Sequence, residues 1–156
     1  MICLNILADF PEKLYNYLGS GTPGLVITIG EDELPNTAYT WVVASDRKTA
    51  RFAVDQQSNT QINLEGNGRC AIQIIGPENL LYLLKGQAHF ISDPIEMASL
   101  SLLIAEMSEM QIKDQSWKGV SVTPLAYQWP AGQSKRMEKM EDALFDQMRI
   151  ELQPHQ

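Results

Sequence analysis

Hydroxyl and amide side chains gather in one short segment, Ser58-Asn59-Thr60-Gln61. A serine followed three residues later by a glutamine is a capping box, the pattern that begins a helix. The first N–H groups of a helix have no acceptor within it, so a helix start attracts an anion. Ser58, Asn59 and Thr60 are therefore candidates to hold an anionic group such as a phosphate. The alternative is that the whole role of Ser58 is to cap its helix.

Two arginines and two tryptophans are candidates to complete such a site. Arg51 and Arg69 lie on either side of the segment in the sequence and offer positive charge to a dianion. Trp41 and Trp117 offer flat rings that match a planar ligand. Each has an alternative role, because arginines also occupy solvated turns and tryptophans also fill cores or interfaces.

Residues arranged for covalent or metal chemistry are missing from the sequence. It has no nucleophile elbow, no histidine beside a cysteine or serine, and no paired carboxylates. Cys3 and Cys70 are far apart, and neither His89 nor His155 stands close to a cysteine. The sequence therefore predicts no metal site and no disulfide, and its catalytic residues stay unknown.

The segments that must position these residues are mostly short and rich in β-branched side chains, and glycine or turn residues bound them. One exception is the segment from Ser92 to Met110, where Pro94 and the apolar spacing after it predict a helix. Strands are predicted at 25–29, 37–43, 49–54, 70–75, 80–91 and 120–127, and helices at 9–19, 92–110 and 137–148, besides the helix that Ser58 begins.

Six strands joined mostly by hairpins favour a small antiparallel barrel over a doubly wound parallel sheet. The sequence contains no internal repeat and no linker long enough to divide it. Residues 1–156 are therefore expected to form a single domain.

The order of the predicted strands and helices is similar to that of a known protein family. Residues 34–43, 52–64 and 68–74, with Gly86-Gln87-Ala88, give two strands, a short helix that begins at a serine, and two more strands. In this layout, which covers about residues 20–91, the chain resembles the pyridoxamine-phosphate oxidase family. The resemblance implies a mainly β fold, a six-stranded antiparallel split β-barrel with flanking helices. It also implies FMN as the cofactor and a homodimer.

The resemblance implies that the FMN phosphate lies at the start of the short helix, held by Ser58, Thr60 and backbone N–H groups with Arg51 or Arg69 as cationic help. In the family a Ser-Arg-Lys triplet binds the phosphate there, whereas Asn59 and Thr60 stand at the two basic positions of this chain. The arginine and the lysine that the family has on the preceding strand fall on Ala38 and Val43 of this chain, and its phosphate-binding threonine falls on Val54.

These departures argue against pyridoxamine-phosphate oxidase activity itself and leave two hypotheses. The first is an FMN-binding, flavin-dependent oxidoreductase of unknown substrate, in which the cofactor performs the electron transfer. The alternative is a cofactor-free or non-flavin module on the same barrel, binding a deazaflavin or haem. Haem would find in His89 an isolated axial ligand.

Composition and charge restrict the partners. The chain has 44% hydrophobic residues and a net charge of −7, with no basic stripe to offset it. An acidic surface repels the phosphates of nucleic acid and of anionic membranes, so neither is expected as a partner. The sequence shows no leader pattern and no apolar run near the 20 or so residues that span a bilayer, which predicts a cytoplasmic protein. The long strands and three tryptophans favour a homodimer.

Overall fold

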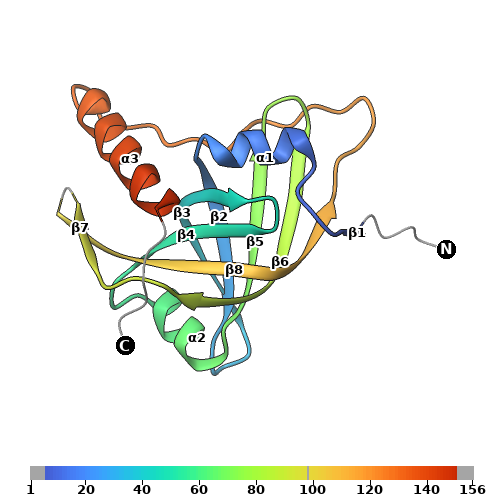
Figure 1. Ribbon diagram of the computed structural model, residues 1–156. Coiled ribbons are helices and arrows are strands. Elements are labelled where there is room, and N and C mark those ends of the chain that lie inside the picture. Colours follow the sequence, from blue (N-terminus) through green and yellow to red (C-terminus); the bar gives the residue numbers. More distant parts are fainter. Residues whose placement is uncertain (1–5, 98, 151–156) are drawn as a thin grey trace.

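The protein is described by a computed structural model that covers residues 6–97 and 99–150 (Figure 1). Antiparallel strands form most of it, and three helices lie at its ends and on one side. The strands are β1 (Ile6–Leu7), β2 (Thr22–Ile29), β3 (Pro35–Asp46), β4 (Thr49–Asp55), β5 (Arg69–Gly76), β6 (Leu80–Phe90), β7 (Ile95–Met97) and β8 (Leu100–Asp114), and the helices are α1 (Glu12–Gly19), α2 (Asn59–Asn67) and α3 (Ser134–Arg149).

Six of these strands close into a barrel. Their hydrogen-bonded order is β8-β4-β3-β2-β5-β6, and β6 pairs again with β8 to complete the ring. The short strands β1 and β7 both pair with β8 outside this ring. The long β8 makes the closure possible, because it pairs with β4 and with β6 along its 15 residues. The predicted fold class, a six-stranded antiparallel barrel with flanking helices, is confirmed.

The barrel interior is filled by every second residue of its strands, as the two-residue period of a strand requires. On β2, for example, buried and partly exposed residues alternate along all eight positions. Helix α1 lies across one end of the barrel and adds Phe10 from its start, with Leu14 and Leu18, to the interior. Helix α2 lies at the opposite end and adds Leu64 (Figure 1).

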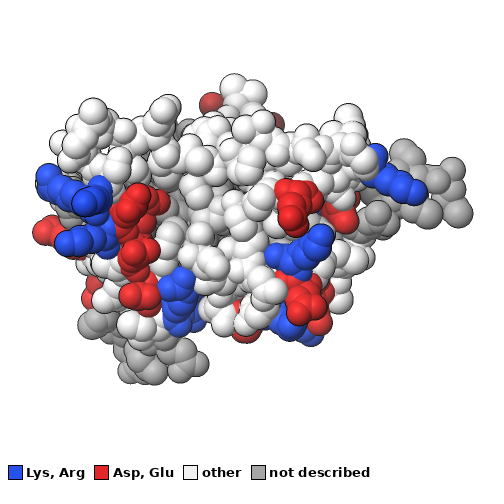
Figure 2. Space-filling view, turned by 90° about the horizontal axis from the view of Figure 1, so that it is seen from above, with Lys and Arg blue, Asp and Glu red and all other residues white. Residues whose placement is uncertain are grey.

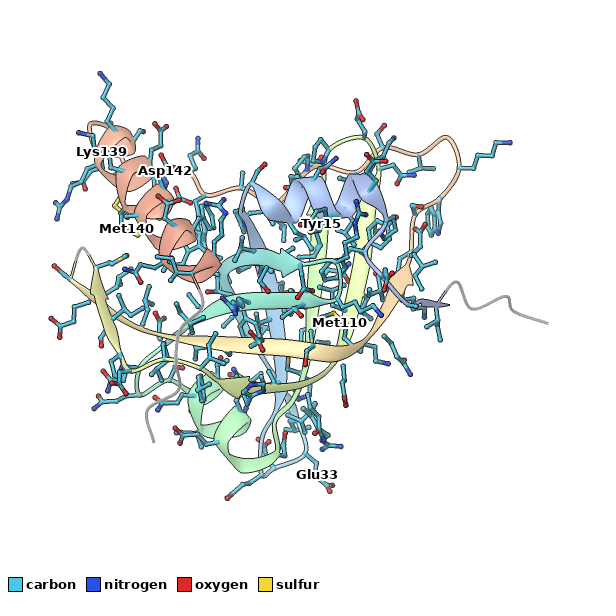
Figure 3. The ribbon with its side chains drawn as sticks, in the orientation of Figure 1. Tyr15, Glu33, Met110, Lys139, Met140 and Asp142 are labelled. Atoms are coloured by element: carbon cyan, nitrogen blue, oxygen red, sulfur yellow. The ribbon has the colours of Figure 1, made fainter. Side chains whose placement is uncertain are left out.

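A second apolar cluster lies outside the barrel, beneath α3. Outward residues of β3, β4 and β8 pack there against the apolar stripe of α3, so that six successive residues of β4 are buried. On α3, Met140 is buried, whereas Lys139 and Asp142 are exposed (Figure 3). The predicted C-terminal amphipathic helix, with its Met137, Met140, Leu144 and Met148 stripe, is therefore confirmed.

The helix predicted over residues 92–110 is wrong, because this segment forms β7 and most of β8. Leu103, Ala105 and Met107 point into the barrel, and Leu102 and Ile104 point into the cluster beneath α3. A strand buried on both faces has a continuous apolar run, which lacks the two-residue alternation that identifies a half-exposed strand.

The strand predicted over residues 120–127 is also wrong. These residues belong to an irregular connection that leads from β8 to α3 and makes isolated backbone contacts, such as the bond from Leu125 N–H to the Ile75 carbonyl at 3.0 Å. The β6–β8 pairing has already closed the ring, so the barrel offers no free edge, and Pro124 lacks an N–H to donate. The remaining five strands and the α2 helix lie where the sequence predicts them.

Charge of both signs is mixed on the surface. Figure 2 shows acidic and basic side chains close together at the α3 end and again at the opposite end of the face, with uncharged surface between them. Within residues 6–97 and 99–150, no helix is long and apolar enough to cross a membrane.

Candidate functional site

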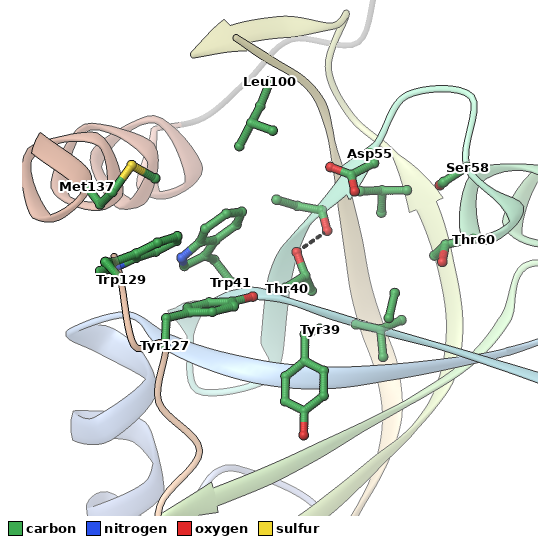
Figure 4. Close-up of a pocket in the computed structure, with 14 residues that line it drawn as sticks. Tyr39, Thr40, Trp41, Asp55, Ser58, Thr60, Leu100, Tyr127, Trp129 and Met137 are labelled. Atoms are coloured by element: carbon green, nitrogen blue, oxygen red, sulfur yellow. Dashed lines mark hydrogen bonds between the residues drawn. The ribbon is translucent and has the colours of Figure 1, made fainter. Parts of the chain in front are cut away.

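A cleft of about 340 Å³ opens where two barrel strands separate (Figure 4). The β3–β4 ladder ends at the Val42–Phe52 pair. Beyond this point β3 continues beside β2, whereas β4 continues beside β8. The hydroxyl of Thr40 donates to the Ala53 carbonyl across the split, in place of a ladder hydrogen bond. The cleft is lined by Val26, Ala38, Tyr39, Thr40, Trp41, Ala53, Val54, Asp55, Ser58, Thr60, Leu100, Tyr127, Trp129 and Met137.

Three aromatic rings pack together at the α3 end of the cleft. Tyr127 stacks on Trp129, with ring centroids 5.1 Å apart, and makes a tilted contact with Trp41, with ring centroids 5.3 Å apart. The indole N–H groups of Trp41 and Trp129 donate to the two oxygens of the Glu141 carboxylate at 2.8 and 3.1 Å. This shared acceptor fixes the orientation of both indoles and so gives the cleft a rigid aromatic wall.

The hydroxyl of Tyr127 stays protonated over the physiological pH range. Burial, the carboxylates of Glu141 and Asp55, and Tyr39 raise the pKa of Tyr127 from an ordinary value near 10 to about 12. The hydroxyl is therefore available as a hydrogen-bond donor near neutral pH.

The start of α2 forms the other end of the cleft. Ser58 caps the helix, as predicted, because its hydroxyl oxygen accepts from Gln61 N–H at 3.2 Å. The amide oxygen of Gln61 accepts in turn from the backbone N–H of Gln57 at 2.6 Å. Asn59 and Thr60 are the first two helical residues, so their N–H groups have no acceptor within α2. Oriented N–H donors are therefore present beside the hydroxyls of Ser58 and Thr60.

The charge of the cleft is negative. Asp55 is the one charged residue among those that line it, and the described residues contribute no lysine or arginine to the lining. The backbone carbonyl of Asp55 accepts from Ser58 N–H at 3.3 Å, which places the carboxylate beside the start of α2 (Figure 4).

The structure brings together some of the predicted site residues and separates others. Ser58, Thr60 and Trp41 line the cleft, and Asn59 follows at the helix start. Arg51 is buried elsewhere, where it pairs with Glu106 at 2.9 Å and donates to the carbonyls of Met148 in α3 and of Ile150, the residue after the helix. Arg69 borders a different depression, on β5 and β6. Trp117 is 72% exposed and borders a third, beside Gln73 and Asn79.

The sequence reasoning missed several residues of the cleft region. It singled out neither Trp129 nor Glu141, gave no site role to Tyr39 or Thr40, and assigned Tyr127 to a strand and Met137 to a core stripe. A signal was present, since Tyr127 and Trp129 stand close together in a segment bounded by Pro124 and Pro130. Two large aromatic residues in an irregular segment indicate a ring surface that the segment holds in place.

Neither the described cysteine, Cys70, nor the described histidine, His89, lines the cleft. Cys70 is buried in the barrel, and burial raises the pKa of its thiol to about 12, which makes it a packing residue. The side chain of His89 is 64% exposed on β6, with Glu106 4.0 Å away. Cys3 and His155 lie outside the described residues. No group of three potential metal ligands occurs within the described part of the chain.

The sequence model of the pyridoxamine 5'-phosphate oxidase family matches residues 10–129. The chain belongs to this family. The match extends from the start of α1 to Trp129 in the cleft wall, and so includes the whole barrel.

Solved structures share the fold of this family member at low sequence identity. HupZ from Group A Streptococcus is 17% identical, with a TM-score of 0.58, over 73% of this chain and 99% of its own. A putative pyridoxamine 5'-phosphate oxidase from Listeria innocua is 15% identical, with a TM-score of 0.50, over 65% of this chain and 95% of its own. A conserved hypothetical protein from Mycobacterium tuberculosis is 14% identical, with a TM-score of 0.52, over 79% and 95%. No curated protein matches the sequence.

Proposed function

We propose that this protein binds a flavin in the cleft between α2 and α3. The main support is the aromatic wall at one end of the cleft, which faces the start of α2 across the gap between β3 and β4. Flavin binding is typical of the family to which the chain belongs. The cleft volume lies at the lower end of the range of about 300–1,000 Å³ that is usual for small-molecule sites.

The ring end of the cleft fits a flavin. Isoalloxazine is flat and aromatic, and offset stacking on the partly exposed Tyr127 or the exposed Tyr39 suits such a ring. The Tyr127 hydroxyl adds a donor beside that surface. These residues would orient the flavin and exclude water from one of its faces, while the flavin, when bound, supplies the electron-transfer chemistry. We propose on this basis that the protein is a flavin-dependent oxidoreductase.

The phosphate end fits FMN less well, although FMN is the flavin that the family resemblance implies. A helix N-terminus stabilises an anion by about 0.3–1 kcal/mol at an exposed site. A charge-assisted hydrogen bond from a cation contributes about 1.5–3 kcal/mol, and neither Arg51 nor Arg69 lines the cleft to make one. Asp55 opposes the phosphate charge as well. The residues present therefore suit the ring better than the dianion.

Titration of the purified protein with riboflavin and with FMN, followed by flavin fluorescence, tests flavin binding. We expect quenching, because the bound ring stacks on an aromatic wall. Tyr39→Ala removes a 60% exposed aromatic side chain from the cleft, and affinity should fall about 2–10-fold. Trp117→Ala is the matched control, since it removes an exposed aromatic side chain elsewhere. Absence of quenching by both flavins would contradict the proposal.

The alternative hypothesis, a cofactor-free or non-flavin module on the same barrel, is favoured by the absence of cations from the described lining of the cleft. An absorption spectrum of the freshly purified protein, with any released chromophore identified by mass, distinguishes the cases. A flavin spectrum supports the first proposal, and a deazaflavin or haem spectrum supports a non-flavin module.

We also propose that the protein is a homodimer. Aliphatic side chains on the outer face of β2, β5 and β6 remain partly exposed, among them Leu25, Ile27, Ile75 and Leu83. A contiguous apolar face of this kind supports pairing with a second copy. Sedimentation at micromolar concentration should give twice the chain mass. A monomer mass would contradict the dimer, and Ile27→Glu should convert a dimer to monomers.

A further inference from the structure

We propose that the cleft selects a flavin whose side chain ends in a neutral hydroxyl and disfavours one that ends in phosphate, with Asp55 as the residue that determines this specificity. The inference rests on the proposed function, since it assumes that a flavin ring occupies the cleft. It names riboflavin, rather than FMN, as the preferred ligand.

Asp55 is positioned by β4 to act on the ligand's side chain. It is the last residue of β4, paired with Leu102 of β8, and it lies where the strand leaves the barrel toward α2. In Figure 4 its carboxylate lies in the cleft between Thr40 and Ser58. A ligand that runs from the aromatic wall to the start of α2 must therefore pass this carboxylate.

Asp55 is exposed where it lines the cleft, and the described residues place no cation in the lining to offset its charge. Asp55 is one of the groups that raise the pKa of Tyr127, so its field reaches the aromatic wall. Arg51, which precedes it on β4, lies at the C-terminal end of α3, where Glu106 and the carbonyls of Met148 and Ile150 bind its guanidinium.

A ribityl chain matches the groups at this end of the cleft better than a phosphate does. Each hydroxyl of the chain both donates and accepts, so it can donate to the Asp55 carboxylate and accept from the N–H groups of Asn59 or Thr60. A phosphate dianion has acceptors only and brings two negative charges toward Asp55. The N–H donors of α2 can bind either a ribityl hydroxyl or a phosphate, whereas the Asp55 carboxylate can accept only from a ribityl hydroxyl.

Separate titrations with riboflavin and FMN at low and at physiological ionic strength test the inference. We expect riboflavin to bind at least tenfold more tightly than FMN at low salt, and the difference to shrink as salt screens the Asp55 charge. In Asp55→Asn the preference should fall at least fivefold, mainly because FMN binds more tightly. Glu78→Gln, which removes an equal charge from the exposed β5–β6 turn, should keep the wild-type ratio.

The possible results separate this inference from the proposed function. FMN binding as tightly as riboflavin in the unmodified protein would overturn the specificity and leave flavin binding intact. A riboflavin preference that survives in folded Asp55→Asn would overturn the role of Asp55. The salt dependence of the unmodified protein tests whether charge repulsion causes the preference, and Asp55→Asn tests whether that repulsion comes from Asp55. Failure of both flavins to bind would overturn the proposed function, and this inference with it.

Discussion

The indole of Trp41 and the carboxylate of Glu141, which are 100 residues apart in the sequence, meet in a 2.8 Å hydrogen bond between β3 and α3. Trp129 donates to the other oxygen of the same carboxylate at 3.1 Å. One side chain of α3 therefore connects the helix, the preceding irregular segment and the barrel, and this contact builds the aromatic wall of the cleft.

Removing this acceptor should destabilise the protein. Glu141→Ala leaves two indole N–H groups without their acceptor, and hydrogen bonds to a charged group contribute about 1.5–3 kcal/mol each. Because both hydrogen bonds are only partly buried and water can replace the carboxylate, we expect a loss of about 2 kcal/mol in urea unfolding. Glu138→Ala, on the exposed side of α3, should change stability by less than about 0.5 kcal/mol.

Arg51 makes a second connection between α3 and the barrel. Its guanidinium pairs with Glu106 at 2.9 Å and donates to the Met148 and Ile150 carbonyls at 3.1 and 2.7 Å. Arg51→Met should cost about 3 kcal/mol, because it leaves a largely buried carboxylate unpaired. The double variant Arg51→Met, Glu106→Leu should recover part of this loss. An additive result would show that the pair is not coupled.

The exposed ion pair between Lys48 and Asp9, 3.5 Å apart, provides the control for Arg51. Its two side chains are 69% and 51% exposed, so water and salt screen the attraction. Lys48→Met should change the free energy of unfolding by less than about 1 kcal/mol. A loss equal to that of Arg51→Met would mean that burial does not explain the difference.

The sequence predicts those helices and strands whose patterns involve residues close together in the chain. The capping box at Ser58 acts over three residues, so α2 and its start are found from sequence alone. Strands with one exposed face alternate, and five of the barrel strands were predicted. Strand β4 is buried on both faces, but the turn before it and its length of seven residues indicate a strand. Strand β8 was predicted as a helix because both of its faces are covered, one by the barrel interior and the other by α3.

The site was predictable at one end only. Ser58 and Thr60 follow from the helix start, but the opposite wall depends on contacts across the whole chain, such as Trp41 with Glu141. Arg51 illustrates the same limit. An arginine next to a turn is usually solvated, and only the position of α3 shows that this one is buried.

A glycine fixes how closely α3 approaches the barrel. Gly21, at φ +83°, faces the ring of Phe145, and a Cβ there would lie 2.5 Å from a ring carbon. Gly21→Ala should therefore cost about 1–2 kcal/mol for the left-handed backbone and about 1–3 kcal/mol more for the clash. Gly119, at φ +77°, is the matched control, because a Cβ at this position would have no neighbouring atom within 4 Å. Gly119→Ala should show the backbone cost alone in thermal unfolding, and equal losses would contradict the Phe145 contact.

Tyr127 should make the protein less stable at high pH. Its pKa is about 12 in the folded protein, raised first by burial and then by Glu141 and Asp55, against about 10 in the unfolded chain. Between these values the unfolded chain releases a proton that the folded protein retains, so the free energy of unfolding falls as pH rises. The contribution of Tyr127 to the free energy of unfolding is fully present below pH 10 and is lost as pH increases toward 12.

Tyr127→Phe isolates this contribution, because it keeps the ring in the aromatic wall and removes only the titrating group. The fall in stability between pH 10 and 12, measured by urea unfolding, should become shallower by on the order of 1–2 kcal/mol over the interval, a value below the full pKa shift because the side chain is partly exposed. Cys70 and Tyr82, whose pKa values burial also raises, should preserve a residual slope. Tyr39→Phe changes an exposed hydroxyl, and an equal effect there would contradict the assignment to Tyr127.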